Sequence, residues 1–121
     1  SGWNIISTGG VMKDGYLAFL GSRTEEAIRS YYVDKAIFSC KALDKEWGIM
    51  ESQESFAYAK KAMMASGRKK ILVVDSTKFD QTAFSVGGNM QDVNVVVTDR
   101  KPSDKWLKYF QELGVECLYS V

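Results

Sequence analysis

Four polar residues, Asp75, Ser76, Thr77 and Lys78, directly follow a run of four apolar residues. The Asp75 carboxylate could accept hydrogen bonds or carry a proton, and the Lys78 ammonium could hold an anion or a developing oxyanion. The two hydroxyl groups between them could donate or accept. Open α/β sheets bind their ligands at the carboxyl ends of strands, so we predict a ligand site here. The same residues would also form an ordinary turn with Lys78 in solvent.

The element that must position these residues is the apolar run at residues 71–74. It is too short for a helix and lacks the alternation of a half-buried strand, so it predicts a central parallel strand covered on both faces. A second strand-like segment, residues 94–97, is apolar after Asn94 and is followed by Thr98 and Asp99. Two neighbouring strands are therefore expected to end in carboxylates.

Composition excludes several kinds of site. The chain has 16 basic and 15 acidic residues, a net charge of +1, which gives no electrostatic case for wrapping DNA. It contains no histidine, the commonest general base and metal ligand, and only two separated cysteines. We therefore expect no metal and no cofactor. Free buried thiols suit a reducing compartment, and with neither a bilayer-spanning run nor a signal peptide the expected location is the cytoplasm.

Strand-like and helix-like segments alternate along the chain. Strands are predicted at residues 3–7, 35–40, 71–74, 94–97 and 115–121, and helices at residues 22–31, 55–66 and 102–113. This order predicts a single α/β domain over residues 1–121, with a layered, mostly parallel sheet and flanking helices. Ser22 and Glu25 have the spacing of a capping box, and Lys60 is expected to be solvated on its helix.

Two further segments contain candidate site residues. Residues 41–48 are predicted to form a long loop after a strand, where function is common, with Asp44 and Gly48 as its notable members. The alternative is that Asp44 only forms a turn and that Gly48 only provides a position of positive φ. Gly9 and Gly10 form a glycine turn that either lets the backbone approach a ligand or is an ordinary turn.

Five segments together resemble the DeoR family of bacterial transcriptional regulators. They are Thr8-Gly9-Gly10, residues 34–48, residues 56–64, Asp75-Ser76-Thr77-Lys78-Phe79 and Val97-Thr98-Asp99. The resemblance is to the C-terminal effector-sensing domain, which is similar in fold to ribose 5-phosphate isomerase. By position, the ligand-binding residues it implies are Gly10, Asp44, Gly48, Asp75 and Lys78, and the chain departs from the family pattern at Lys41, Ala42 and Met50.

The resemblance implies a domain that binds a small phosphorylated metabolite and transmits its occupancy to an N-terminal winged helix-turn-helix. Neither that DNA-binding domain nor the family's first βα unit, with its phosphate loop, is expected in these residues. DNA contact would then belong to another segment, and no membrane contact is expected. The domain is expected to form a homo-oligomer, through a sheet edge or apolar face left uncovered.

An enzyme is the alternative function, because Asp75 and Lys78 resemble a strand-end pair in the sugar-phosphate isomerases. Enolisation needs a carboxylate base and a cation over the oxyanion. The isomerases carry two close acids after the preceding strand, whereas here Asp44 stands alone between Lys41 and Lys45. The expectation is therefore a sensor that does not turn over its ligand.

Overall fold

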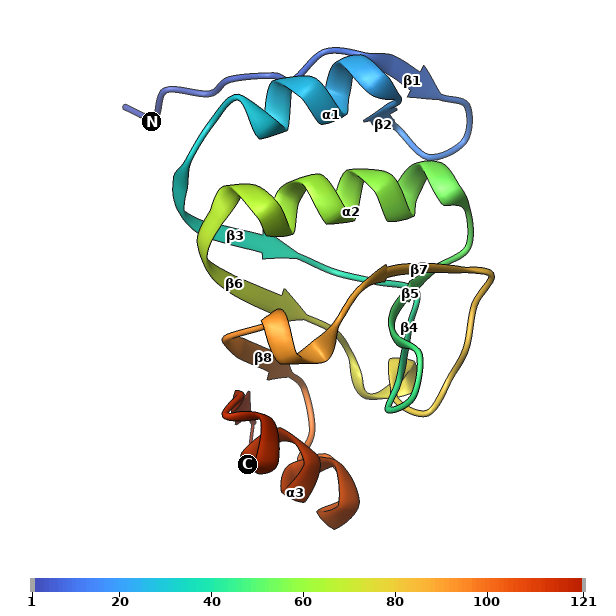
Figure 1. The fold of residues 1–121 in the computed structure, drawn as a ribbon, viewed down its shortest axis with the longest axis vertical. Coiled ribbons are helices and arrows are strands. Elements are labelled where there is room, and N and C mark those ends of the chain that lie inside the picture. Colours follow the sequence, from blue (N-terminus) through green and yellow to red (C-terminus); the bar gives the residue numbers. More distant parts are fainter. Residues whose placement is uncertain (1, 121) are drawn as a thin grey trace.

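The structure, a computed structural model, describes residues 2–120 (Figure 1). Its strands are β1 (Val11–Lys13), β2 (Ala18–Leu20), β3 (Val33–Phe38), β4 (Ala42–Asp44), β5 (Gly48–Glu51), β6 (Gly67–Val73), β7 (Ser85–Gly88), β8 (Val95–Thr98) and β9 (Glu116–Tyr119). Its helices are α1 (Ser22–Arg29), α2 (Glu54–Ser66) and α3 (Asp104–Leu113), with 3₁₀ helices at Ser76–Lys78 and Met90–Asp92. This mixture confirms the predicted α/β class.

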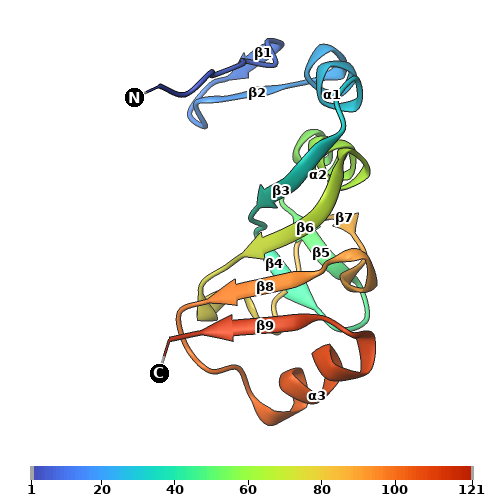
Figure 2. The same ribbon diagram turned by 90° about the vertical axis from the view of Figure 1, so that its left-hand side faces the viewer.

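A four-stranded parallel sheet with the order β3-β6-β8-β9 organises the fold (Figure 2). In β6, Ile71 pairs with Ile37 of β3 on one side and with Val95 of β8 on the other. The prediction that residues 71–74 belong to a central parallel strand is therefore confirmed. Parallel neighbours need crossover connections, and α2 and α3 supply two of them.

One face of this sheet is packed and the other is open within residues 2–120. The packed face and its helices form one buried cluster that includes Phe38, Leu72, Val96, Met64, Trp106 and Phe110. On the opposite face, Ile37, Val73 and Leu118 are 61%, 42% and 48% exposed. The predicted covering of residues 71–74 on both faces is therefore wrong for the described residues, because α2 and α3 contribute to the same core.

Residues 41–48 form most of a β-hairpin instead of the predicted long loop. Asp44 of β4 pairs with Gly48 of β5, and β7 extends this antiparallel sheet on the other edge of β5. The carboxylate of Asp44 accepts the backbone N–H groups of Glu46 and Trp47, at 3.0 and 2.8 Å. Local turn chemistry therefore closes the hairpin.

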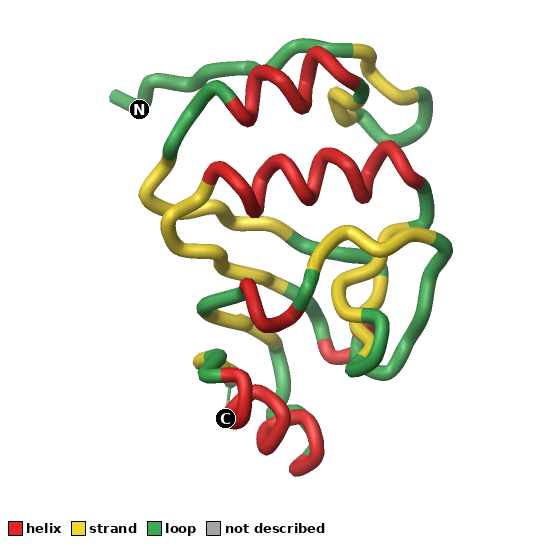
Figure 3. Tube along the Cα trace, in the orientation of Figure 1, coloured by secondary structure: helices red, strands yellow, loops and turns green. Residues whose placement is uncertain are grey.

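The start of the chain departs most from prediction. Residues 3–7 have no regular secondary structure, because no strand among the described residues pairs with them. The hairpin of β1 and β2 follows, and α1 then packs along α2 (Figure 3). The predicted capping box is wrong, since the N-cap of α1 is Gly21 and Ser22 already lies inside the helix.

The ends of α2 and α3 follow their expected signals more closely. Gly67 ends α2, and Gly114 ends α3 in the left-handed conformation with φ of 73°. The hydroxyl of Ser103 accepts the backbone N–H of Trp106 at 3.3 Å and caps α3. Among residues 2–120, no helix has both the length and the apolar character that a bilayer crossing requires.

Candidate functional site

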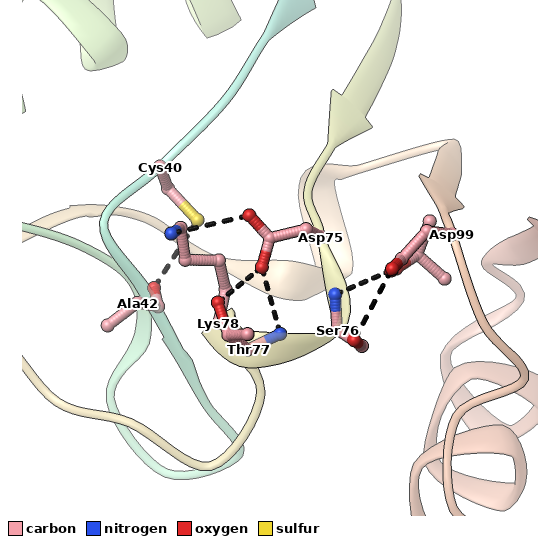
Figure 4. A network of polar contacts seen from close by, with 8 residues as sticks. Cys40, Ala42, Asp75, Ser76, Thr77, Lys78 and Asp99 are labelled. Carbon is pink, nitrogen blue, oxygen red and sulfur yellow. Dashed lines mark hydrogen bonds and ion pairs between the residues drawn. The ribbon is translucent and has the colours of Figure 1, made fainter.

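The carboxyl end of β6 continues into a 3₁₀ turn, Ser76–Lys78, that Asp75 caps (Figure 4). The Oδ1 atom of Asp75 accepts hydrogen bonds from the backbone N–H of Thr77, at 2.9 Å, and from the Thr77 hydroxyl. Its Oδ2 atom lies 3.4 Å from Nζ of Lys78, whose side chain is 29% exposed. The structure thus places Asp75 and Lys78 together at the strand tip, with the ammonium reachable from solvent.

Asp99, at the end of β8, ties the two strand ends together. Its Oδ1 atom accepts the backbone N–H of Ser76 at 2.7 Å, and Oδ2 lies 3.5 Å from the Ser76 hydroxyl (Figure 4). The expectation that two neighbouring strands end in carboxylates is confirmed. Asp99 was not predicted as a site residue, although its place at a strand end after Thr98 was the available signal.

Hydrogen bonds keep both carboxylates ionised. The side-chain and backbone donors of Thr77 lower the pKa of Asp75, with a smaller contribution from Lys78. Desolvation alone would raise the pKa of Asp99, but the Ser76 N–H and neighbouring donors outweigh it and lower this pKa as well. Both groups are therefore weak bases at neutral pH, suited to accepting hydrogen bonds rather than to abstracting protons.

Asp44 and Gly48 have structural roles in the hairpin. The Asp44 carboxylate is engaged by the turn, and no hydrogen bond or ion pair within residues 2–120 joins it to Asp75 or Lys78. The hairpin nevertheless adjoins the 3₁₀ turn, because Leu43 forms a bridge with Phe79. Gly48 has φ of +91°, and a Cβ atom there would lie 2.6 Å from the Gly88 carbonyl oxygen.

Gly10 belongs to the packing of the N-terminal hairpin on α1. A Cβ atom at Gly10 would collide with the Thr24 side chain, whose hydroxyl donates to the Gly9 carbonyl at 2.7 Å. This contact explains the glycine without a ligand. Of the five candidate residues, the structure joins Asp75 and Lys78 by direct contact, whereas Gly10 lies against Thr24 and Leu20.

A buried ion pair was missed by sequence reasoning. Nζ of Lys60 on α2 lies 3.2 Å from Oε1 of Glu51 on β5, and these side chains are only 14% and 9% exposed. The prediction that Lys60 is solvated is wrong, because its partner comes from a different element. A charge at helical spacing gives no signal of such a partner.

The thiol of Cys40, which follows β3, is buried close to these charges. Burial, and secondly the Glu51 carboxylate, raise the pKa of Cys40 to about 12. Its Sγ atom lies 3.4 Å from the Ala42 carbonyl oxygen. Both cysteines are free, and Cys117 is only partly buried.

We expect iodoacetamide at pH 8 to label Cys117 before Cys40, because the thiolate is the reactive form and Cys40 is both buried and weakly acidic. Peptide mass spectrometry over a time course measures the two rates. In denaturant the two thiols should react alike. Equal rates in the folded protein would show that Cys40 is not enclosed as described.

Residues 1–100 match the family model described as the DeoR C terminal sensor domain. The chain belongs to the DeoR family. Asp75 and Lys78 therefore lie at a strand tip of a sensor domain, and the resemblance based on the motifs around them is confirmed.

Three curated relatives in this family illustrate its range. The chain is 33% identical over 107 residues to the L-fucose operon activator of Haemophilus influenzae, covering 88% of this chain and 43% of that protein. It is 36% identical over 96 residues to the uncharacterized HTH-type transcriptional regulator YulB of Bacillus subtilis, covering 79% and 37%. It is 33% identical over 99 residues to the transcriptional repressor AccR of Agrobacterium fabrum, covering 81% and 38%. The chain thus spans less than half the length of these DeoR-family relatives.

Proposed function

We propose that this DeoR-family sensor domain binds a phosphorylated sugar or a related metabolite at the tip of β6. The observation that carries the proposal is the Lys78 ammonium, held 3.4 Å from Asp75 while its side chain stays 29% exposed. A lysine in this position keeps free N–H donors for a ligand oxygen, and Asp75 can accept from a ligand hydroxyl. The name of one relative, an L-fucose operon activator, supports a sugar-derived effector.

We further propose that ligand binding here regulates DNA binding by a domain outside this chain. A net charge of +1 supports this division, because DNA-binding modules depend on clustered basic charge. In this proposal residues 1–121, of which 1–100 match the family model, act as one sensing unit. A regulator of transcription works where bacterial DNA is, so the proposed location is the cytoplasm.

The proposed domain senses its ligand without converting it. Aldose–ketose isomerisation needs a base whose pKa lies near the working pH. Hydrogen bonds from Thr77 hold the pKa of Asp75 below its ordinary value, which works against proton abstraction. The curated relatives described above are named as transcriptional regulators, which also favours a sensor.

Two finer points of architecture belong to the same proposal. The parallel sheet with its strand-tip pair is compatible with the fold of ribose 5-phosphate isomerase. We also propose that the domain forms a homo-oligomer through its open sheet face. Exposed apolar side chains at Ile37, Val73 and Leu118 support this, since burial of such surface stabilises association.

Thermal unfolding with a panel of aldose and ketose phosphates, L-fucose phosphate among them, tests the function. A ligand at about 100 times its Kd should stabilise the protein by about 2.7 kcal/mol. We expect Lys78→Ala to abolish this stabilisation while changing the unliganded midpoint little. Lys105→Ala, at an exposed position of α3, is the matched control and should keep the wild-type response.

The free sugars serve as ligand controls, and the longer regulator is tested in parallel. The proposal is contradicted if no sugar phosphate of the panel stabilises this chain or the longer regulator. It is also contradicted if Lys78→Ala is stabilised as much as the wild type. Aldose–ketose interconversion by the same samples would show an enzyme instead of a sensor. Light scattering over a concentration series checks the oligomer, and a strict monomer would contradict that part.

A further inference from the structure

A second polar pair faces a cavity close to the strand-tip site. The cavity measures about 280 Å³ and is lined by residues that include Tyr16, Ser39, Cys40, Glu51, Ser52 and Lys60. Ligand cavities typically start at about 300 Å³, so this space suits a small metabolite or one part of it. Its charged groups are Glu51, which is buried, Lys60, which is mostly buried and lies 3.2 Å from Glu51, and the exposed Lys41.

This ion pair is poorly explained by stability alone. Two charges removed from water recover their desolvation cost only with good geometry, and apolar residues of similar volume usually serve as well or better. The pair is nevertheless enclosed, because the backbone of β7 at Gly87 packs against the stems of both side chains. Nζ of Lys60 also lies 5.7 Å from the centre of the Phe38 ring, which holds the ammonium in place.

The pair has the hydrogen-bonding capacity that a polyhydroxylated ligand needs. An ammonium has three donors, of which Glu51 occupies one, and a carboxylate has several acceptor positions. Each hydroxyl of a sugar both donates and accepts, so an adjacent donor and acceptor can bind one hydroxyl or two neighbouring ones. Ser39 and Ser52, both exposed and both lining the cavity, add further hydroxyl partners.

The cavity and the strand-tip site are connected through Cys40. This residue lines the cavity, and its thiol lies within the electrostatic influence of Glu51, Lys60 and Lys78. In Figure 4 the Lys78 side chain extends from the 3₁₀ turn toward Cys40. Asp75 and Lys78 do not line the cavity themselves, so a ligand that contacts both pairs must extend past Cys40.

We propose that Glu51 and Lys60 recognise the hydroxyl groups of the effector in this cavity, while Lys78 and Asp75 bind another part of the same molecule. This inference rests on the proposed function and assigns its specificity to a pair on β5 and α2. A polyhydroxylated moiety is the class that fits, because the pair places hydrogen-bond donors beside acceptors, while the exposed Lys41 adds one positive charge at the cavity. Removing a bound hydroxyl from the ligand would leave one buried charge without that partner.

The test uses the sugar phosphate that stabilises the wild type most, together with its deoxy analogues, measured by calorimetric titration. The double variant Glu51→Met with Lys60→Met removes both charges at similar volume and should stay folded. We expect it to bind about tenfold or more weakly and to lose the preference for the parent sugar over a deoxy analogue. Lys61→Met, on the exposed side of the same helix, is the control and should bind like the wild type.

Each outcome separates the two proposals. If the folded double variant binds and discriminates like the wild type, the pair is structural only and this inference is overturned, while the proposed function stands. If no wild-type titration shows binding, both fail. Should the double variant not fold, the Lys60 side-chain NMR signal of the wild type decides. A shift on addition of the sugar phosphate supports the inference, and an unchanged signal overturns it.

Discussion

Replacing Trp106 with alanine is expected to destabilise the fold by about 3–5 kcal/mol, the usual cost of removing a buried tryptophan. Trp106 is 1% exposed and packs edge-on against Phe79, with ring centres 5.1 Å apart. Its Nε1–H donates to Asp80 at 2.9 Å. Because Phe79 and Asp80 directly follow Lys78, the substitution should also weaken effector binding. Denaturant unfolding with the ligand titration measures both effects.

Trp47→Ala is the matched control for this substitution. Trp47 is 57% exposed near the tip of the β4–β5 hairpin, where a surface substitution usually changes stability by about 0.5 kcal/mol or less. Similar unfolding midpoints for the two variants would contradict the packing described for α3. A large loss of stability together with weaker effector binding, both confined to Trp106→Ala, would confirm that this helix supports the strand-tip site.

Gly48→Ala should be the second most damaging change, at about 2–5 kcal/mol. The left-handed backbone at φ of +91° costs a residue with a Cβ atom about 1–2 kcal/mol. That atom would also lie 2.6 Å from the Gly88 carbonyl oxygen, so β5 and β7 must separate, which adds about 1–3 kcal/mol. Thermal unfolding measures the loss.

Gly114→Ala separates these two causes. Gly114 also has a positive φ, of 73°, but a Cβ atom there meets nothing within 4 Å. We therefore expect only the conformational part, about 1–2 kcal/mol. If Gly48→Ala costs no more than Gly114→Ala, the close approach of β7 to the hairpin is not as described.

The parallel sheet and α3 could be predicted because their signals are local. The continuous apolar runs at residues 71–74 and 95–97 have few alternatives to a buried strand. Ser103 and Gly114 mark the ends of α3 through hydrogen bonding and backbone conformation. In contrast, the strand predicted at residues 3–7 depended on a neighbour that a local pattern cannot provide. Local signals also did not show that one face of the sheet is open.

In the candidate site, only the contacts between residues close in sequence could be predicted. Asp75 and Lys78 are three positions apart on one turn, so their contact follows from the strand end itself. Asp44 is an aspartate like Asp75, yet its carboxylate closes a hairpin. The sequence alone could not distinguish that hairpin from a functional loop. Glu51 and Lys60 meet only because β5 and α2 pack together, and that packing has no local sequence signature.

These observations define one account in which the tip of β6 and the adjoining cavity bind a sugar-derived effector. The two ion pairs, Asp75–Lys78 and Glu51–Lys60, come from different elements, and the charges of Glu51, Lys60 and Lys78 all act on the Cys40 thiol. The account requires that a single ligand contacts both. It also requires that the opposite ends of the strands, where Lys35, Arg68 and Lys69 are exposed, remain uninvolved.

The most direct test is an amide NMR shift map of the chain during titration with the stabilising sugar phosphate. We predict that the largest shifts fall on residues 39–41, 51–60 and 75–78, with little change at residues 67–69. Shifts centred on residues 67–69, or no shifts at saturating sugar phosphate, would contradict the account.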